Sequence, residues 1–254
     1  MKRFEDRRVL VTGAGSGIGR ATVHRILAEG GTVVAADVVA AGLDATRAQA
    51  EADGTADRLS TVVVDISDEE SVRAGIGGAI AGLGGLDVLV NAAGILRSAH
   101  TERTTLEFWN RMLAVNLTGT FLVTREALPA LLATGRGVVV NFSSTSASFA
   151  HPYMAAYAAT KGGIQSFTHA IAAEYAGRGL RAVSVAPGSI ASGMTADPGL
   201  PEDADTSWFA KLRPALGQGF AGPETVAGVI AMLASDDGAF VTGTEIRIDG
   251  GTHA

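Results

Sequence analysis

The chain has 254 residues, 47% of them hydrophobic, and it contains no cysteine. A chain of this length buries a large core without crosslinks, and the lack of cysteine excludes disulfides, thiolate catalysis and cysteine-ligated zinc. The 26 acidic residues exceed the 20 basic ones, which argues against a nucleic-acid or anionic-membrane partner. No apolar run spans about 18 residues, and the N-terminal residues do not form a signal peptide, so we expect a cytoplasmic protein without a membrane span.

Short β-branched runs alternate with longer helical stretches along the chain. The candidate strands are Val9–Thr12, Thr32–Asp37, Leu59–Val64, Leu86–Asn91, Gly137–Ser143, Arg181–Ala186 and Thr244–Ile248. The candidate helices are Gly17–Glu29, Asp44–Ala52, Asp68–Ala81, Thr105–Ala133, Ala155–Arg178 and Pro223–Ala234. Most strands are apolar at consecutive positions, which is typical of strands covered on both faces. We therefore predict one α/β domain over residues 1–254, a doubly wound seven-stranded parallel sheet with helices on both faces.

Residues 193–222 break this alternation, with neither a strand signal nor a long amphipathic period. The segment contains Pro198, Pro201 and Pro214 and several glycines. An irregular stretch of this length inside a compact domain is typical of a lid or binding loop. We predict a substrate-binding lid here; a surface excursion without a role is the alternative.

The first candidate strand leads into a glycine-rich loop, Thr12-Gly13-Ala14-Gly15-Ser16-Gly17-Ile18-Gly19. Glycines let backbone N–H groups approach a pyrophosphate, and the N-terminus of the following helix adds partial positive charge. One such loop is weak evidence in a chain with 33 glycines. Its position at the first strand-to-helix junction nevertheless favours dinucleotide binding and a Rossmann-type fold.

Asp37 ends the second candidate strand, eighteen residues after Gly19. A carboxylate there can accept hydrogen bonds from the adenosine ribose hydroxyls and would repel a 2′-phosphate. A like-charge pair at about 4 Å costs roughly 4 kcal/mol at an effective dielectric of ~20. Neither Ser16 nor Val38 is an arginine that could reverse this preference. NAD is therefore predicted over NADP, unless Asp37 is only a solvated acid at a strand end.

Tyr157 and Lys161 lie four residues apart near the start of the candidate helix Ala155–Arg178, so they share one helix face. A tyrosine pKa near 10 is too high for efficient proton transfer at neutral pH, and a nearby ammonium lowers it. The pair therefore predicts general acid–base chemistry, although such pairs often only stack on a surface. Only three of the 20 basic residues are lysines, which indicates that a compact ammonium is needed here.

With these motifs, the chain resembles the short-chain dehydrogenase/reductase family in its shorter, NAD-preferring branch. The resemblance rests on the glycine loop, Asn91-Ala92-Ala93-Gly94, Asn116, Asn141-Phe142-Ser143-Ser144, the Tyr157–Lys161 pair and Pro187-Gly188, and it extends to Asp249-Gly250-Gly251.

The resemblance implies roles for four catalytic residues. Tyr157 would be the proton donor and acceptor, while Lys161 would lower the pKa of Tyr157 and hold the nicotinamide ribose. Ser144, thirteen residues before Tyr157, would orient the substrate oxygen. Ser143 is the alternative. Asn116 would position a water that links Lys161 to solvent, and it can also be a structural residue at a helix kink.

The resemblance also implies further cofactor contacts beside the loop residues Gly13, Ser16, Gly17, Ile18 and Gly19 and beside Asp37. These are Asp65 and Ile66 at the adenine, then Asn91, Ala93 and Gly94, and finally Pro187, Gly188, Ile190 and Ser192, in addition to Tyr157 and Lys161. Ala92 stands where the family usually has a second asparagine that stabilises the sheet centre. Ser192 stands where a threonine often binds the carboxamide, and it retains the hydroxyl.

The substrate pocket is expected to include His151, Tyr153, Met194 and Trp208. For His151 and Tyr153, a plain loop role is the alternative. Apolar side chains in residues 193–222 suit a hydrophobic or alicyclic ketone or alcohol, or they simply pack the segment down. The acids Glu202, Asp203 and Asp205 argue against an anionic substrate. The five histidines lack metal-ligand spacing, so no metal is expected.

The predicted function is NAD-dependent hydride transfer between nicotinamide and a secondary alcohol or ketone. A 3-oxoacyl-acyl-carrier-protein reductase and a non-catalytic NAD sensor are the alternatives. A sugar-nucleotide epimerase would need a longer C-terminal domain, and an enoyl reductase would need a tyrosine where Met154 stands. The family resemblance further implies a homotetramer through the helices at 105–133 and 155–178.

Overall fold

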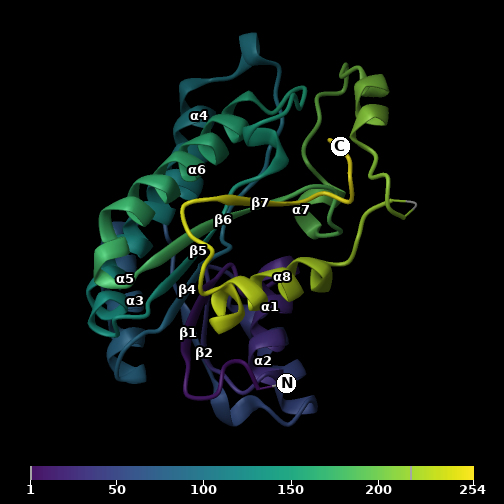
Figure 1. The fold of residues 1–254 in the computed structure, drawn as a ribbon. Coiled ribbons are helices and arrows are strands. Elements are labelled where there is room, and N and C mark those ends of the chain that lie inside the picture. The colour runs from purple at the N-terminus through teal and green to yellow at the C-terminus, as the bar shows by residue number, and fades with distance from the viewer. Residues whose placement is uncertain (1, 218) are drawn as a thin grey trace.

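The computed structural model describes residues 2–217 and 219–254. Its strands form one sheet in the order β3-β2-β1-β4-β5-β6-β7, and all neighbouring pairs are parallel (Figure 1). The strands are β1 (Arg8–Thr12), β2 (Thr32–Asp37), β3 (Leu59–Val63), β4 (Val88–Asn91), β5 (Val138–Phe142), β6 (Arg181–Pro187) and β7 (Glu245–Ile248). This architecture confirms the predicted Rossmann-type, doubly wound fold.

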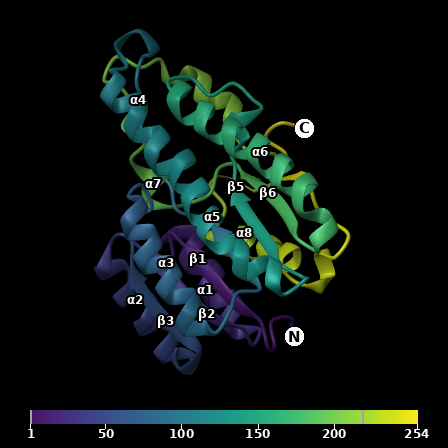
Figure 2. The ribbon, with the colours of Figure 1, turned by 90° about the vertical axis from the view of Figure 1, so that its left-hand side faces the viewer.

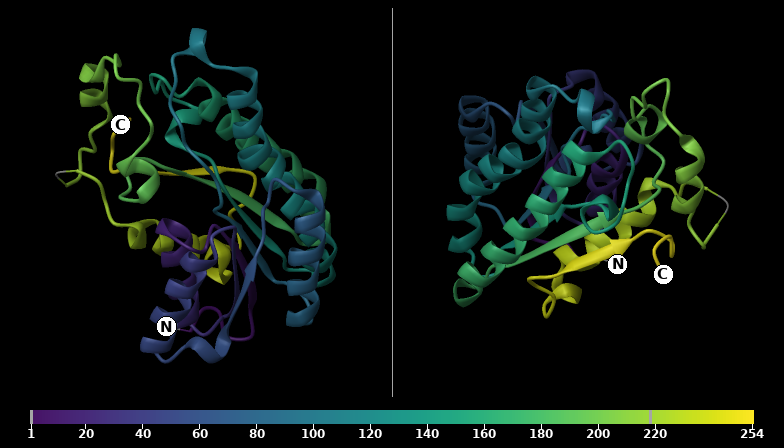
Figure 3. Two further views of the ribbon diagram at one scale, coloured as in Figure 1. Left: turned by 180° about the vertical axis from the view of Figure 1, so that it is seen from behind. Right: turned by 90° about the horizontal axis from the view of Figure 1, so that it is seen from above.

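Helices cover both faces of the sheet. They are α1 (Gly17–Ala28), α2 (Ala40–Ala52), α3 (Glu69–Leu83), α4 (Leu106–Met112), α5 (Gly119–Ala133), α6 (Ala155–Tyr175), α7 (Gly193–Ala196) and α8 (Pro223–Ala234). Helices α1, α2 and α8 contribute to one core, and α3, α5 and α6 contribute to the other. Figures 2 and 3 show the ribbon from three further directions, with helices on both faces of the sheet. None of the helices in the described part of the chain is both long and apolar enough to cross a membrane.

The alternation of side chains along the strands explains the consecutive apolar runs. In β1, Val9 and Val11 belong to the core beneath α1, whereas Leu10 belongs to the core beneath α3 and α5. Because both faces are covered, neither set of side chains is exposed to water.

Strand register brings polar side chains together at the carboxyl ends of the central strands. Thr12 of β1 pairs with Asn91 of β4, and Asn91 pairs with Asn141 of β5. The chain leaves β1 toward β2 on one side and later enters β4 on the other. Such a reversal of strand order opens a crevice at the carboxyl edge, where ligands bind in open α/β sheets.

The candidate helix Thr105–Ala133 is interrupted in the structure. Helix α4 and helix α5 are joined without a loop by a π-helical segment, Leu113–Thr118, that contains Asn116. The Asn116 side chain bonds both main-chain groups of Ile95, with Oδ1 accepting from N at 2.8 Å and Nδ2 donating to O at 2.9 Å. A π-helical turn inside a longer helix is often found at functional sites.

Candidate active site

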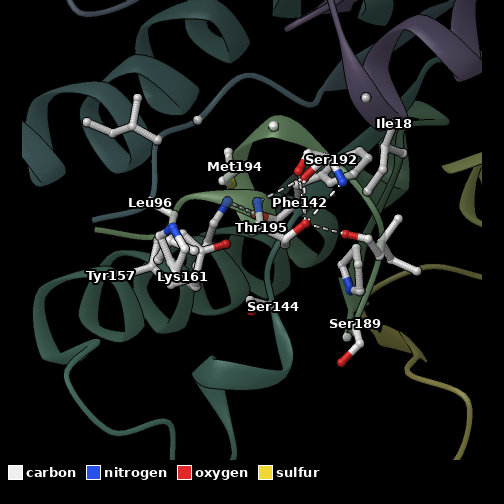
Figure 4. A pocket seen from close by; sticks show the side chains of 18 of the residues that line it. Ile18, Leu96, Phe142, Ser144, Tyr157, Lys161, Ser189, Ser192, Met194 and Thr195 are labelled. Carbon is white, nitrogen blue, oxygen red and sulfur yellow. Dashed lines mark hydrogen bonds between the residues drawn. The ribbon is translucent and has the colours of Figure 1, made fainter. Parts of the chain in front are cut away.

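A cavity of about 1360 Å³ lies along the carboxyl edge of the sheet. Its lining comes from the glycine loop, the segments that follow β2 to β6, the start of α6, and residues 193–222. Three of the four catalytic candidates, Ser144, Tyr157 and Lys161, line this cavity, whereas Asn116 does not. Figure 4 shows Tyr157 and Lys161 close together on α6, with Ser144 nearby. The cavity is larger than typical small-ligand sites, which suits a dinucleotide together with a substrate.

The glycine loop leaves room and charge for a pyrophosphate. Gly13 has φ +67°, and a Cβ there would lie 2.7 Å from the Ala93 main chain. A Cβ on Gly19 would lie within 3 Å of the Gly13 carbonyl oxygen. Ser16 begins α1 without a side-chain cap, and the first helical turn has no acidic residue. The positive end of α1 therefore remains available to an anion, so these residues fit the phosphates of a dinucleotide.

Asp37 lies at the end of β2 on the cavity wall. One carboxylate oxygen accepts from Gly15 N at 2.9 Å and the other from Val39 N at 2.9 Å. A Cβ on Gly15 would lie only 2.9 Å from this carboxyl group, so glycine is needed for the contact. Each carboxylate oxygen has a second lone pair, which leaves capacity for hydroxyl donors.

The segments after β3 and β4 complete this end of the cavity. Asp65 and Ile66 line it, and hydrogen bonds from Ser67 hold the pKa of the Asp65 carboxyl below its usual range. Ala93 and Gly94 also line the cavity. A Cβ on Gly94 would lie 3.1 Å from Asn116 Oδ1.

Asn91 lies behind the cavity wall in a buried polar network. Its Nδ2 donates to Thr124 Oγ1 at 2.9 Å and to Asn141 Oδ1 at 2.8 Å, and Asn141 Nδ2 donates to Thr168 Oγ1 at 2.9 Å. Asn91 Oδ1 is buried without a partner among the described residues. Ala92 supplies no side-chain amide beside it. The network therefore ties β4 and β5 to α5 and α6 but leaves one acceptor unsatisfied.

Tyr157 and Lys161 lie on consecutive turns of α6, where Lys161 is buried and Tyr157 is half-buried. Lys161 Nζ donates to the Phe142 carbonyl oxygen at 2.7 Å and lies 5.5 Å from the centre of the Tyr157 ring. The ammonium is thus held by the end of β5 next to the tyrosine. As the sequence predicts, their spacing of four residues places the two side chains on the same face of the helix, one turn apart.

Burial controls the proton affinity of both groups. It raises the pKa of Tyr157 to about 12, although a hydrogen bond with Ser144 acts in the opposite direction. It lowers the pKa of Lys161 to about 8. From the sequence, the ammonium of Lys161 is expected to lower the pKa of Tyr157. Here desolvation dominates, because it disfavours the charged form of each group.

The two adjacent serines have different surroundings. Ser143 Oγ donates to the Lys161 main-chain oxygen at 3.3 Å, within the protein. Ser144 Oγ accepts from Ser146 N at 3.2 Å and also bonds Tyr157. The geometry therefore favours Ser144 as the serine that reaches a substrate oxygen.

The loop after β6 lies close to the end of β7. A Cβ on Gly188 would lie 2.7 Å from the Asp249 side chain, so this approach requires glycine. Pro187, Ile190 and Ser192 line the cavity with it. The Ser192 hydroxyl caps α7 by accepting from Thr195 N at 3.2 Å, and Figure 4 shows these two side chains in contact.

The structure separates the four predicted pocket residues into two pairs. His151 and Met194 line the cavity, whereas Tyr153 and Trp208 are not among the described lining residues. The Tyr153 hydroxyl accepts from Asp205 N at 2.8 Å, outside the cavity. Trp208 is 53% exposed, with Lys211 Nζ 4.0 Å from its ring centre.

Several lining residues were not predicted as site residues. They include Leu96, Phe142, Phe209, Leu212, Arg213, Phe220, Thr252 and His253. The apolar residues of the 193–222 segment were visible in the sequence, but which of them turn inward depends on the turn at Thr206–Leu212. No sequence pattern indicated that residues near the C-terminus return to the cavity.

A Rossmann-type sheet, a glycine-rich loop after β1 and a tyrosine–lysine pair at the same cavity are typical of a dinucleotide-dependent oxidoreductase. The chain belongs to the short-chain dehydrogenase family, whose pattern it matches over residues 7–202. It is therefore an oxidoreductase of CH–OH and C=O groups that uses a nicotinamide cofactor.

Similar proteins span nearly the whole chain. A 3-oxoacyl-(acyl-carrier-protein) reductase of Thermotoga maritima is 39% identical over 249 residues, covering 98% of each chain. A cis-4-hydroxycyclohexanecarboxylate dehydrogenase of Sinomonas cyclohexanicum is 38% identical over 252 residues, covering 99% of this chain and 98% of the relative. The crystal structure of levodione reductase superposes with a TM-score of 0.89 at 34% identity and covers 98% of each chain.

Proposed function

We propose that the protein is an NAD-dependent dehydrogenase/reductase that acts on a secondary alcohol or ketone, with an apolar or alicyclic substrate. The observation that carries the proposal is that Tyr157, Lys161 and Ser144 meet in a cavity whose wall also contains Asp37. The first three supply proton transfer and polarisation, and Asp37 supplies the cofactor preference.

The proton chemistry falls to the chain's own residues. When bound, the nicotinamide ring supplies or accepts the hydride. Ser144 donates a hydrogen bond to the substrate oxygen, and Tyr157 takes the proton from an alcohol or returns it to the oxygen of a ketone. Lys161 carries positive charge beside the tyrosine, which favours its phenolate form during transfer. Asn116 holds the segment around Ile95 and lies beside this relay.

Asp37 supports NAD over NADP. Its carboxylate is positioned by two backbone N–H groups and can still accept ribose hydroxyls. Arg20 is the first arginine after the glycine loop, and its side chain donates to Thr46 Oγ1 and to the Gly42 carbonyl oxygen. Among the described lining residues, none from the end of β2 or the start of α2 is cationic. A 2′-phosphate would therefore face a carboxylate without a compensating charge.

Apolar side chains on the 193–222 side support an apolar substrate. Met194, Leu200, Phe209, Leu212 and Phe220 all line the cavity there. Two of the similar proteins are named for alicyclic compounds, levodione and 4-hydroxycyclohexanecarboxylate. A ring-shaped secondary alcohol or ketone is consistent with both observations.

The test is the absorbance change of nicotinamide with NAD⁺ and NADP⁺ in parallel, across alicyclic, steroidal, polyol and 3-hydroxyacyl alcohols. We expect turnover with NAD⁺ and an alicyclic or steroidal alcohol. Turnover only with NADP⁺ would refute the role given to Asp37. Activity restricted to 3-hydroxyacyl thioesters would refute the substrate class.

The relative from Thermotoga maritima favours one alternative, reduction of 3-oxoacyl-acyl-carrier-protein. An acetoacetyl thioester with NADH or NADPH distinguishes it from the main proposal. A non-catalytic sensor is a further alternative, and it would bind NADH without turnover of any substrate.

We further propose a cytoplasmic homotetramer that associates through α4–α5 and α6, with residues 193–222 acting as the substrate lid. Leu106 is 73% exposed and Phe121 is 41% exposed on these helices. Phe121 packs edge-to-face against Phe167 of α6 at 6.3 Å, so an apolar surface spans both helices. Light scattering tests this assembly, and a monomeric mass would refute it.

A further inference from the structure

Tyr157 lies in the first turn of α6, where a helix has the least internal support. The first four N–H groups of a helix have no partner within it, and Met154, which precedes α6, offers them no side-chain hydrogen bond. Tyr153, just before, has φ +66°, a conformation that residues other than glycine rarely adopt. Gly162 and Gly163 follow this part of the helix and lower its intrinsic stability. Contacts from outside the helix must therefore hold the turn that carries Tyr157.

Lys161 is held by the end of β5. Its Nζ donates to the Phe142 carbonyl oxygen at 2.7 Å, and its main-chain oxygen accepts from Ser143 Oγ at 3.3 Å. Both bonds fix the lysine, and neither reaches the turn before it. The position of Tyr157 thus depends on a different contact.

Thr160 supplies that contact. Its side chain is fully buried, and its hydroxyl donates to the Tyr157 carbonyl oxygen at 2.7 Å while it accepts from Asn116 Nδ2 at 3.2 Å. One hydroxyl group donates one hydrogen bond and can accept two, so both bonds form together. A threonine that bonds the carbonyl of the preceding turn changes the local helix geometry. Thr160 therefore ties the turn of Tyr157 to the π-helical segment Leu113–Thr118.

Asn116 gives this tie a fixed direction. Because its amide bonds both main-chain groups of Ile95, the side chain cannot exchange Oδ1 for Nδ2. The second N–H of Nδ2 then points to Thr160. Among the side-chain hydrogen bonds of residues 2–217 and 219–254, this one alone joins Leu113–Thr118 to α6. The series Ile95–Asn116–Thr160–Tyr157 therefore connects a cavity-lining loop to the turn of the tyrosine.

The same helix contains a second threonine with the same pattern of bonds. Thr168 is also fully buried, donates to the Ile164 carbonyl oxygen at 2.7 Å and accepts from Asn141 Nδ2 at 2.9 Å. The two threonines differ in what they hold, because Thr168 lies about three helical turns beyond Tyr157. A purely structural role predicts that both hydroxyls matter in the same way. A role in positioning the tyrosine predicts that only Thr160 affects its chemistry.

We propose that Thr160 is a positioning residue for the reaction, whose hydroxyl holds Tyr157 in the place beside Ser144 and Lys161 from which the phenol exchanges its proton. The proposal rests on the function proposed above, because it takes Tyr157 as the group that moves the proton. A hydrogen bond from Ser144 and the charge of Lys161 both favour the phenolate. A displaced turn weakens both influences, so Tyr157 becomes a weaker acid and proton transfer slows.

The test that needs no substrate is a fluorine NMR titration of the NADH-bound protein labelled with 3-fluorotyrosine. The chain has three tyrosines, and the signal of Tyr157 is the one missing in Tyr157→Phe. Thr160→Val replaces the hydroxyl by a methyl group of similar shape, and it should raise the pKa at this position by about half a unit or more. Thr160→Ser, which keeps the hydroxyl, and the matched control Thr168→Val should leave that pKa unchanged. Thr160→Ala serves if Thr160→Val does not fold.

Steady-state kinetics with the best alcohol of the substrate panel gives the second readout. In Thr160→Val, kcat should fall by about tenfold, because small displacements of a reacting group are costly, and the solvent deuterium isotope effect on kcat should rise. NADH affinity should stay within about threefold, since the change leaves the cofactor contacts in place. Thr168→Val should lower the urea midpoint as much as Thr160→Val does, with the isotope effect of the unmodified protein.

Two results would overturn the proposal while leaving the proposed function intact. One is a pKa of Tyr157 and a kcat in Thr160→Val equal to those of the unmodified protein. The other is the same pKa rise and kcat loss in Thr168→Val, which indicates that both threonines act only through stability. If the unmodified protein turns over no alcohol of the panel, the proposed function fails. The fluorine titration then still decides whether Thr160 holds Tyr157.

Discussion

The two walls of the cavity are held by different kinds of interaction. The sheet wall, formed by the glycine loop and the carboxyl ends of β1 to β6, rests on buried strands and on the Asn91–Asn141–Thr168 network. The loop wall, residues 193–222, leaves Trp208, Leu216 and Phe220 more than half exposed. It contacts the rest of the chain through exposed hydrogen bonds, such as that from Asp205 N to the Tyr153 hydroxyl, and through the ring of Phe209 beside that of Tyr153. Regions held in this way open at lower free energy than core strands.

This difference predicts where substitutions act. Residues of the sheet wall cannot shift to accommodate a substitution. For example, a Cβ added at Gly13, Gly19 or Gly188 would lie within 3 Å of neighbouring main-chain atoms. A substitution in the loop wall removes only one of several independent contacts that hold residues 193–222 in place. We therefore expect large effects on chemistry and cofactor binding from the first, and small effects on substrate binding from the second.

The largest effect is expected for Tyr157→Phe. Removal of the hydroxyl eliminates the proposed proton donor and acceptor, so turnover should fall by about 10³-fold or more, within the range of general acid–base catalysis. NADH binding, measured by fluorescence, should remain within about threefold, because the phenyl ring preserves packing. Tyr175→Phe, at the far end of α6, is the control for loss of a tyrosine hydroxyl. Turnover that survives in Tyr157→Phe would remove the basis for the proposed chemistry.

The next effect concerns Lys161 and the pH dependence of stability. Its pKa is about 8 in the fold against 10.5 as a free side chain. Between these pH values the unfolded chain holds a proton that the folded protein does not, so stability rises with pH in this window. Below pH 8 the fold carries the full cost of the buried charge, up to about 3 kcal/mol. Relative to Lys161→Met, the protein should therefore gain up to about that amount from pH 7 to 10.5.

Urea denaturation of both proteins at pH 7, 8, 9 and 10 measures this difference. Tyr157, whose pKa in the fold is about 12, stays protonated in both folded proteins up to pH 10, so it contributes equally to both. A difference in unfolding free energy that stays constant with pH would contradict the assignment of a buried, weakly basic Lys161.

A smaller effect is expected for Gly15→Ala, which tests how Asp37 is positioned. The new methyl group would lie 2.9 Å from the Asp37 carboxyl, so the carboxylate must move. We expect NAD⁺ affinity to fall by about tenfold, equivalent to ~1.4 kcal/mol, with little change in turnover at saturating cofactor. Gly78→Ala on α3 is the matched control, because a Cβ there meets nothing within 4 Å. Equal NAD⁺ affinity in the two variants would show that Asp37 does not contribute to cofactor binding.

The sequence could predict the sheet wall because its signals are local. Tyr157 and Lys161 share a face of one helix by spacing alone, and Asp37 follows directly from the end of an apolar run. The strand candidates agree with the structure to within two residues at each end. Most strands are buried on both faces and apolar at consecutive positions, which explains this agreement, whereas β3 and β7 are only partly buried.

The remaining features depend on contacts between distant segments. The π-helical turn at Asn116 arises beside Ile95, 21 residues away in the chain. His253 reaches the cavity only through the turn organised by Asp249 and through stacking on Phe149. Trp208 lies in the predicted segment but is more than half exposed, because the 3₁₀ helix Thr206–Leu212 turns the neighbouring Phe209 toward the cavity instead. No local pattern distinguishes these two aromatic residues.

The smallest effect is expected for Tyr153→Phe, which removes one tie of the loop wall. The Tyr153 hydroxyl accepts from Asp205 N at 2.8 Å, while its ring contacts Phe209 and His100. The ring contacts remain in the variant, and Asp203 still pairs with His100 and Arg103. Since one exposed hydrogen bond contributes about 1 kcal/mol or less, substrate KM should rise no more than about fivefold, with kcat and NADH affinity unchanged. Steady-state kinetics with the best alicyclic alcohol measures this. A loss of turnover as large as that expected for Tyr157→Phe would mean that Tyr153 takes part in the reaction itself. It would also mean that the loop wall tolerates substitution no better than the sheet wall.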